Sequence, residues 1–121
     1  TPARVLYLIR YQGPQWFEPV TYFGNNTLKD IYDYEPVERS WTTKMRSLLM
    51  GIQGSMWTDL QQAEEVEYLI FPRLAAVAEG AWTFPVYKDW DRFLAALDNF
   101  TGHLDVKGIT YARSMYNIQH K

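Results

Sequence analysis

Two stretches of the chain have the hydrophobic pattern of buried strands. Residues 4–10 are nearly continuously apolar, which is typical of a strand covered on both faces, as in a parallel sheet. A second apolar run begins at residue 47 and contains Gly51 and Gly54. Glycine within a strand favours the close approach of another segment. The pattern therefore predicts strands at residues 4–10 and 47–57, with a close approach near the end of the second.

The first strand is followed by an irregular stretch and then by a short helix. Residues 11–26 combine Gly, Pro, Gln and Asn with several aromatic side chains, which is typical of a long functional loop. Thr27 is a suitable N-cap for a helix over residues 28–34. Pro36 should end this helix, because the residue before a proline avoids the helical region. We interpret residues 35–46 as a connection.

Two longer helices are predicted in the second half of the chain. One covers residues 63–82 and is kinked at Pro72, which lies inside its apolar stripe. The other covers residues 88–107, and Gly108 follows it in the position that most often ends a helix. The tail, residues 108–121, has no clear period. The two apolar faces consist of Val66, Leu69, Ile70, Leu74, Val77, Ala78 and Ala81, and of Trp90, Phe93, Leu94, Leu97, Phe100 and Leu104.

The predicted order is strand, helix, strand, helix, helix, which places the chain in the α/β class. The connection between the strands is long enough to make them parallel neighbours. Two parallel strands cannot cover both of their faces, and 121 residues are too few for a whole β/α barrel, which needs about 250. We therefore expect a segment of a larger α/β barrel, or a chain that finds partner strands by self-association.

The composition and charge of the chain make some classes of binding partner unfavourable. The net charge is −2, with 12 basic and 14 acidic residues, and it provides no basic field for nucleic acid or an anionic membrane surface. No apolar run approaches the roughly 20 residues of a membrane span. The chain has no cysteine, which excludes disulfides and thiol chemistry. Its first residues carry no targeting pattern, so we expect any export signal to lie upstream of Thr1.

Aromatic residues make up 17% of the chain, and each must either fill the core or stack on a ligand. Sugar binding is the specific alternative to packing, because a pyranose ring presents an apolar face of C–H groups to an aromatic plane. Trp57 is the foremost candidate, since it ends the second predicted strand in the triplet Trp57-Thr58-Asp59. Barrels of the β/α type place ligand-facing groups at the carboxyl ends of their strands.

These residues resemble family 20 of the glycoside hydrolases, the β-N-acetylhexosaminidases. The barrel of that family closes with a strand ending in Trp-Thr-Glu and a helix that contains a Tyr, a Pro-Arg and an Ala-Glu-x-x-Trp. The counterparts here, in the same order, are Trp57-Thr58-Asp59, Tyr68, Pro72-Arg73 and Ala78-Glu79-Gly80-Ala81-Trp82. Further counterparts are Tyr11-Gln12-Gly13, Glu18-Pro19, Thr27-Leu28, Ile31-Tyr32, Tyr34-Glu35-Pro36, Trp90, Gly108-Ile109 and Tyr111-Ala112-Arg113.

The resemblance implies a partial (β/α) TIM barrel, made of its last two strands with their helices and a helix-rich carboxyl-terminal half. It covers nearly the whole chain but only the last part of the family's catalytic domain. Residues 1–121 would therefore form a single segment of that domain. The family also suggests an exported protein, periplasmic or extracellular.

The activity that the resemblance implies is retaining hydrolysis of terminal β-linked N-acetylglucosamine or N-acetylgalactosamine. The nucleophile is the substrate's own acetamido oxygen. The general acid of the family is a Glu preceded by an Asp on an earlier strand, and no Asp-Glu pair occurs in this sequence. We therefore expect no catalytic residue in this chain, no cofactor, and no turnover by the chain alone.

By position, the resemblance assigns sugar-binding roles to Trp57, Asp59 and Tyr7. Trp57 would stack beneath the sugar, Asp59 would bond ring hydroxyls, and Tyr7 would donate to the acetamido carbonyl. Asp59 is one methylene shorter than the family's Glu, and Ile9 stands where the family has an Asp. A polar ligand group left unpaired costs about 1–3 kcal/mol. Without the resemblance, Asp59 equally fits the cap of the next helix, and Tyr7 fits a buried position bonded to backbone.

Two other hypotheses follow from the same residues. The departures at Ile9 and Asp59 favour a non-catalytic or degenerate fragment that acts as a self-associating interaction module, with a dimer as the expected assembly. A plain helical scaffold, whose aromatic side chains all pack internally, would instead be a monomer without a sugar response.

Several further residues have more than one interpretation. Trp16 and Trp41 lie in predicted loops and fit either acceptor-site aromatics or exposed clamps. Arg73 and Glu79 lie about two turns apart on one predicted helix and fit structural ion pairs. No metal site is expected, because ligand spacing is lacking around the two histidines, His103 and His120.

Overall fold

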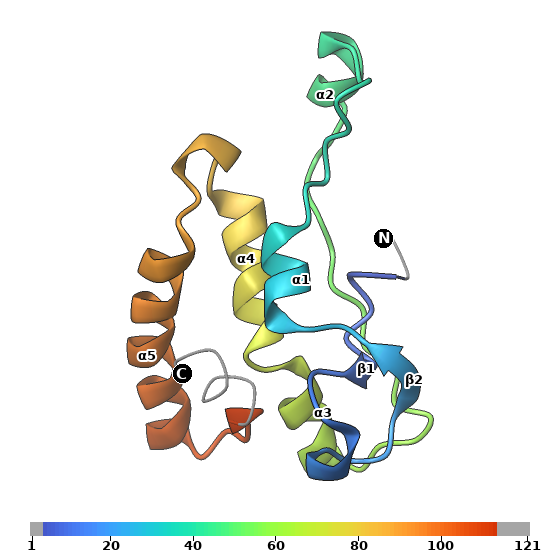
Figure 1. The fold of residues 1–121 in the computed structure, drawn as a ribbon, viewed down its shortest axis with the longest axis vertical. Coiled ribbons are helices and arrows are strands. Elements are labelled where there is room, and N and C mark those ends of the chain that lie inside the picture. The colour runs from blue at the N-terminus through green and yellow to red at the C-terminus, as the bar shows by residue number, and fades with distance from the viewer. Residues whose placement is uncertain (1–3, 114–121) are drawn as a thin grey trace.

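The computed structural model describes residues 4–113 (Figure 1). Helices dominate, and Figure 1 shows α4 and α5 side by side, with α1 against α4 and α2 at the tip of a long excursion. No helix among these residues is both long and apolar enough to cross a bilayer. The elements in chain order are β1 (Arg10–Tyr11), η1 (Gln15–Phe17), β2 (Tyr22–Asn25), α1 (Leu28–Asp33), α2 (Thr43–Ser47), α3 (Ala63–Ile70), α4 (Arg73–Trp82), η2 (Pro85–Tyr87) and α5 (Trp90–Lys107).

The helix ends follow the predicted caps. At the start of α1, the Thr27 hydroxyl accepts from the Asp30 N–H at 3.1 Å, and the Asp30 carboxylate accepts from the Thr27 N–H at 2.9 Å. Such a capping box satisfies two of the free donors of the first turn. Helix α5 begins at Trp90 because Asp89 caps it, and it ends at Gly108, whose φ of 69° is left-handed. Of the predicted tail, the structure describes the part up to Arg113.

The single kinked helix expected over residues 63–82 is wrong. The chain forms two helices, α3 and α4, separated at the cis Phe71–Pro72 peptide bond. Proline has no N–H to donate to the carbonyl four residues earlier, so a helix does not continue through it without disruption. Here the disruption is complete, and Pro72 becomes the residue that precedes α4.

The two long strands were also predicted incorrectly. Residues 4–10 and 47–57 meet in one parallel bridge, Tyr7 with Ser55, formed by Leu8 N–H to Ser55 O at 2.7 Å and Ser55 N–H to Leu6 O at 2.8 Å. The parallel orientation agrees with the prediction. A continuous strand ladder, however, needs several successive pairs of residues, and Tyr7 with Ser55 is the single bridge between these two segments of the described chain. Helix α2, capped by the Thr42 side chain, was not predicted and occupies the end of the expected connection, so that only its last residue, Ser47, belongs to the second run.

The predicted loop, residues 11–26, contains structure of its own. It includes η1 and β2, and β2 pairs in parallel with β1, with Arg10 opposite Tyr22. An irregularity in register follows directly after this pair. The loop is therefore folded back along the end of the first segment.

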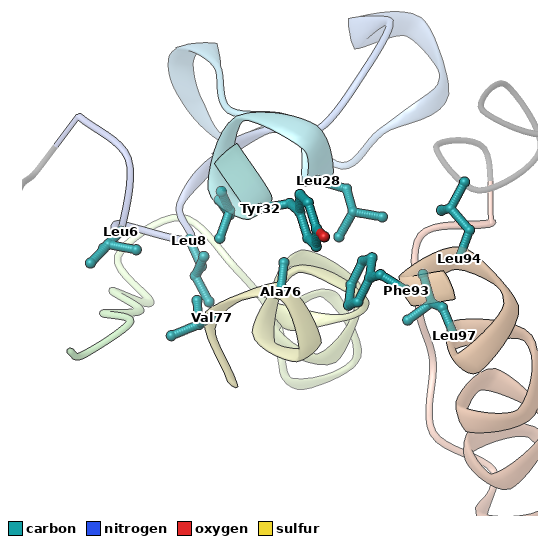
Figure 2. Close-up of a cluster of buried hydrophobic side chains, with 10 residues drawn as sticks. Leu6, Leu8, Leu28, Tyr32, Ala76, Val77, Phe93, Leu94 and Leu97 are labelled. Atoms are coloured by element: carbon teal, nitrogen blue, oxygen red, sulfur yellow. The ribbon is translucent and has the colours of Figure 1, made fainter. Parts of the chain in front are cut away.

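The core lies where α1, α4 and α5 meet the first segment (Figure 2). Leu6 and Leu8 are almost fully buried, whereas Tyr7 and Ile9 between them are partly exposed. This alternation covers one face of the segment, not both as expected. Gly54 packs closely, since a Cβ there would lie 3.4 Å from Leu8, but nothing lies near Gly51. The core members are Leu6, Leu8, Leu28, Ile31, Tyr32, Ala76, Val77, Phe93, Leu94 and Leu97.

Candidate functional site

Two aromatic rings meet beside the single parallel bridge. Tyr7 is a bridge residue, and Trp57 lies two residues after its partner Ser55. The ring centroids of Tyr7 and Trp57 are 6.3 Å apart with 21° between the planes, which is a stacked arrangement. Trp57 is 53% exposed and Tyr7 is partly buried. The pair therefore offers an aromatic surface to solvent instead of filling the core.

Asp59 lies two residues beyond Trp57 and is exposed. Its Oδ2 accepts a hydrogen bond from the Tyr22 hydroxyl at 2.5 Å, and this bond raises the pKa of the Tyr22 phenol. The interpretation of Asp59 as a helix cap is wrong, because α3 begins after Gln62, whose N–H donates to the Glu65 carboxylate at 2.9 Å. The Asp59 carboxylate thus accepts a hydrogen bond from a tyrosine hydroxyl and, because the residue is exposed, is accessible to a polar ligand.

A second contact joins the same two segments. The Gln61 side-chain amide donates to the Val20 carbonyl at 3.2 Å and to the Thr21 hydroxyl at 3.1 Å. The Thr21 hydroxyl in turn donates to the carbonyl of Ile9. The loop that carries Asp59 is therefore fastened to the residues just before β2.

Arg73 is a key residue that sequence reasoning assigned wrongly. Its side chain is fully buried, and its five N–H groups all donate to main-chain carbonyls. Arg73 and Glu79 were both expected to form structural ion pairs; Glu79 forms one, with Arg92, whereas Arg73 forms none with the described residues. The signal was present in the sequence, because Arg73 shares the helical spacing of the buried Ala76 and Val77. The carbonyls belong to Leu8, Arg10, Asn26 and Leu69, at 2.6–3.0 Å.

Burial shifts the pKa values of Arg73 and of the nearby acid Glu18. Burial lowers the pKa of the Arg73 guanidinium to about 9, and the negative charge of Glu18 opposes that shift. Glu18 accepts the Gln12 N–H at 2.7 Å, while its other oxygen is buried without a partner among the described residues. Burial raises the pKa of the Glu18 carboxyl, against the hydrogen bond from Gln12 and the charge of Arg73.

The two candidate acceptor-site tryptophans lie in other places. Trp16 is 80% exposed in η1 and lines a cavity of about 570 Å³ with Gln12 and Asn25. Trp41 is half-buried near α2 and lines another cavity of about 600 Å³. Trp57 lines neither cavity. The structure therefore does not bring either tryptophan into one cavity with the stacked pair.

The exposed aromatics contradict the scaffold hypothesis in which all such side chains pack internally. The most exposed are Trp16, Phe17, Phe23, Trp57, Trp82, Phe84 and Tyr87. Residues 4–113 contain no group of three His, Cys, Asp or Glu side chains that could hold a metal ion. His120, named with His103 in the sequence, lies outside the described residues.

The chain is similar in sequence to known proteins of one family. Residues 1–85 match the family described as glycosyl hydrolase family 20, catalytic domain. A beta-hexosaminidase of Porphyromonas gingivalis is 37% identical over 107 residues, which are 88% of this chain and 14% of that protein. A beta-N-acetylhexosaminidase of Cellulomonas fimi is 41% identical over 71 residues, 58% of this chain and 14% of its own length. The chain thus spans about 14% of the length of these relatives.

Solved structures give the same relationship. The GH20 exo beta-N-acetylglucosaminidase from Vibrio harveyi, crystallised in complex with N-acetylglucosamine, matches with a TM-score of 0.75 at 30% identity, over 91% of this chain and 18% of that one. A GH20 beta-N-acetylhexosaminidase from Streptomyces coelicolor matches with a TM-score of 0.74 at 25% identity, over 92% of this chain and 22% of that one. The helix-rich fold is that of a part of these catalytic domains, which are TIM barrels. Because the family match covers most of the chain and the fold agrees with it, the chain belongs to glycosyl hydrolase family 20.

Proposed function

We propose that this chain supplies one wall of an N-acetylhexosamine site in the catalytic barrel of a β-hexosaminidase, as the segment with the last two strands. The observation that carries the proposal is the stacked pair of Tyr7 and Trp57 beside the parallel bridge, with the Asp59 carboxylate two residues further on. The Vibrio harveyi relative, whose fold this chain shares, was crystallised with N-acetylglucosamine.

The three side chains have complementary chemistry for such a sugar. The exposed face of Trp57 suits the C–H groups of a pyranose ring, the Tyr7 hydroxyl is a donor for an acetamido carbonyl, and Asp59 is an acceptor for ring hydroxyls. Ile9 provides no hydrogen bond from its side chain. Recognition of the ring hydroxyls therefore rests on one carboxylate, and we expect weak binding of the free monosaccharide.

Hydrolysis by the substrate-assisted route also needs a proton donor. The Asp-Glu pair that the family uses is absent from this sequence, so we place the general acid in another part of the barrel. In this proposal the chain binds and orients the sugar, and bond cleavage requires the remaining strands. The chain alone should release no product from an aryl N-acetyl-β-glucosaminide.

A titration with N-acetylglucosamine, followed by the ¹H–¹⁵N signals of the tryptophan indoles, tests the proposal. We expect the Trp57 indole signal and the backbone amide signals of its neighbours to shift, and the response of those amides to weaken by about tenfold or more in Trp57→Ala, which lacks the indole. Trp82→Ala is the matched control, because Trp82 is 89% exposed and takes no part in the stacked pair. A wild-type response that survives unchanged in Trp57→Ala, or no response at all, would contradict the proposed wall.

The alternative, a self-associating interaction module, has one observation in its favour. Apolar side chains at the end of α4 and in η2 are strongly exposed, and contiguous surfaces of this kind favour association. Sedimentation equilibrium distinguishes the two functions when it is combined with the titration, since a dimer without a sugar response supports the alternative. The exposed side chains are Trp82 (89%), Phe84 (74%), Val86 (81%) and Tyr87 (69%).

A further inference from the structure

The Asp59 carboxylate has an asymmetric environment. One oxygen, Oδ2, accepts the Tyr22 hydroxyl at 2.5 Å, a short bond of the kind expected between a hydroxyl and an ionised acid. The residue as a whole is exposed, so this bond serves neither to satisfy a buried group nor to close a core. Tyr22 and Asp59 are 37 positions apart in the sequence, so their exposed hydrogen bond needs an explanation other than core packing.

Tyr22 is itself firmly placed. It opens β2, where its N–H donates to the Ile9 carbonyl at 3.2 Å and its register partner is Arg10. The residue as a whole is partly buried, and its phenol hydroxyl is exposed. Its hydroxyl therefore reaches Asp59 from a position fixed by strand pairing.

The loop bearing Asp59 is fastened close by as well. Gln61, two residues later, donates to both Val20 and Thr21. Three hydrogen bonds thus join residues 59–61 to residues 20–22, one to the Asp59 carboxylate and two from the Gln61 amide. A side chain held in its productive rotamer loses less conformational entropy when a ligand binds.

From these contacts we propose that Tyr22 is a positioning residue, which fixes Asp59 through Oδ2 and leaves Oδ1 to accept one hydroxyl of the sugar. This inference rests on the proposed function. A carboxylate with both oxygens free can present one unengaged oxygen to each of two neighbouring hydroxyls, whereas here Oδ2 is already engaged by Tyr22 and Oδ1 is the unengaged oxygen. The arrangement also holds the short side chain of aspartate toward the ligand, in place of the longer side chain of glutamate.

The test compares Tyr22→Phe, Asp59→Ala and the double variant in the same N-acetylglucosamine titration. Tyr22→Phe removes only the hydroxyl and should weaken binding roughly three- to tenfold. In the Asp59→Ala background the same change should have no further effect, because there is no carboxylate to position. Tyr87→Phe is the matched control, since Tyr87 is 69% exposed in η2.

A second measurement does not depend on the sugar. The hydrogen bond to Asp59 raises the pKa of Tyr22, so the pKa read from its ¹³Cζ signal should fall toward 10 in Asp59→Ala. A residue that merely fills space next to the loop would show no such change. Thermal unfolding of Tyr22→Phe separates loss of binding from loss of fold.

The outcomes distinguish this inference from the proposed function. A wild-type protein that does not respond to the sugar contradicts both. A wild-type response that Tyr22→Phe leaves unchanged contradicts only the positioning role. An effect of Tyr22→Phe that persists in Asp59→Ala also overturns it, because Tyr22 would then contact the sugar directly.

Discussion

Arg73 and Asp59 are two charged residues in opposite environments. Arg73 is fully buried, and all five of its N–H groups are used by main-chain carbonyls of the protein. Asp59 is exposed and makes one hydrogen bond, from Tyr22. The guanidinium has no donor left for a ligand, whereas the carboxylate has an acceptor oxygen to offer.

The difference separates a buried residue that holds the backbone from an exposed residue that we propose to bind the ligand. Arg73 joins the carbonyls of Leu8 and Arg10 to that of Asn26, so it fixes the first segment against the end of β2. These segments carry Tyr7 and Tyr22, and the Tyr22 hydroxyl donates to Asp59. A buried cation therefore determines the backbone on which the exposed groups stand.

The largest predicted effect is the loss of this cation. Arg73→Met keeps much of the side-chain volume but leaves several buried carbonyls without a donor. We expect a loss of about 3–5 kcal/mol in the free energy of unfolding, measured by urea denaturation with far-UV circular dichroism. Asp59→Asn, in the exposed environment, should change stability by less than about 0.5 kcal/mol.

Arg73→Lys is the informative companion if Arg73→Met does not fold. Lysine keeps the charge but has three donors on a single atom, so it cannot reproduce the planar fork. We expect its stability to lie between those of the wild type and Arg73→Met. Equal stability of Arg73→Met and the wild type would remove the distinction between the two regions.

The second prediction compares two aromatic residues, one from each region. Phe93 is 4% exposed and packs against both Tyr32 and Trp90, at 5.0 and 5.6 Å between ring centroids. Phe93→Ala should cost about 3–5 kcal/mol in the free energy of unfolding. Trp57→Ala should cost less than about 1 kcal/mol, because half of that side chain is already in solvent. A comparable loss for both variants would make Trp57 a packing residue.

Local signals in the sequence predicted the helix ends well. Thr27 and Gly108 stand where α1 begins and α5 ends, because a capping side chain and a left-handed glycine act on their own turn. Pro72 was also recognised as a point of disruption. Its effect was underestimated, since tertiary packing decides whether a proline bends a helix or divides it.

Features that depend on distant partners were harder to predict. The apolar run at residues 4–10 gave no information on how many neighbours would pair with it, and only one bridge and the short β1 form. The resemblance assigned Tyr7, Trp57 and Asp59 to one site, but it predicted neither the stacking of Tyr7 on Trp57 nor the hydrogen bond from Tyr22 to Asp59. The hydrogen bonds of Arg73 were hidden for the same reason, because main-chain acceptors leave no mark in the side-chain pattern.

The smallest predicted effect concerns Glu18, whose carboxylate accepts the Gln12 N–H and is attracted by the charge of Arg73. Burial raises the pKa of its carboxyl above the ordinary value of 4.5, against the opposing hydrogen bonds of Gln12 and Gly13 and the charge of Arg73. The folded protein then binds the proton more tightly than the unfolded chain. The stability contributed by this group is fully present below pH 4.5 and is lost as the pH rises through the folded pKa.

Glu18→Gln removes this titration, so the measurement is the difference in unfolding free energy between the wild type and the variant from pH 4 to pH 8. We expect this difference to move steadily in favour of Glu18→Gln as the pH rises. Movement in the opposite direction would mean that the attraction of Arg73 outweighs the burial of Glu18. Arg73 would then belong to an ion pair, and the contrast with Asp59 would lie in exposure rather than in the kind of partner.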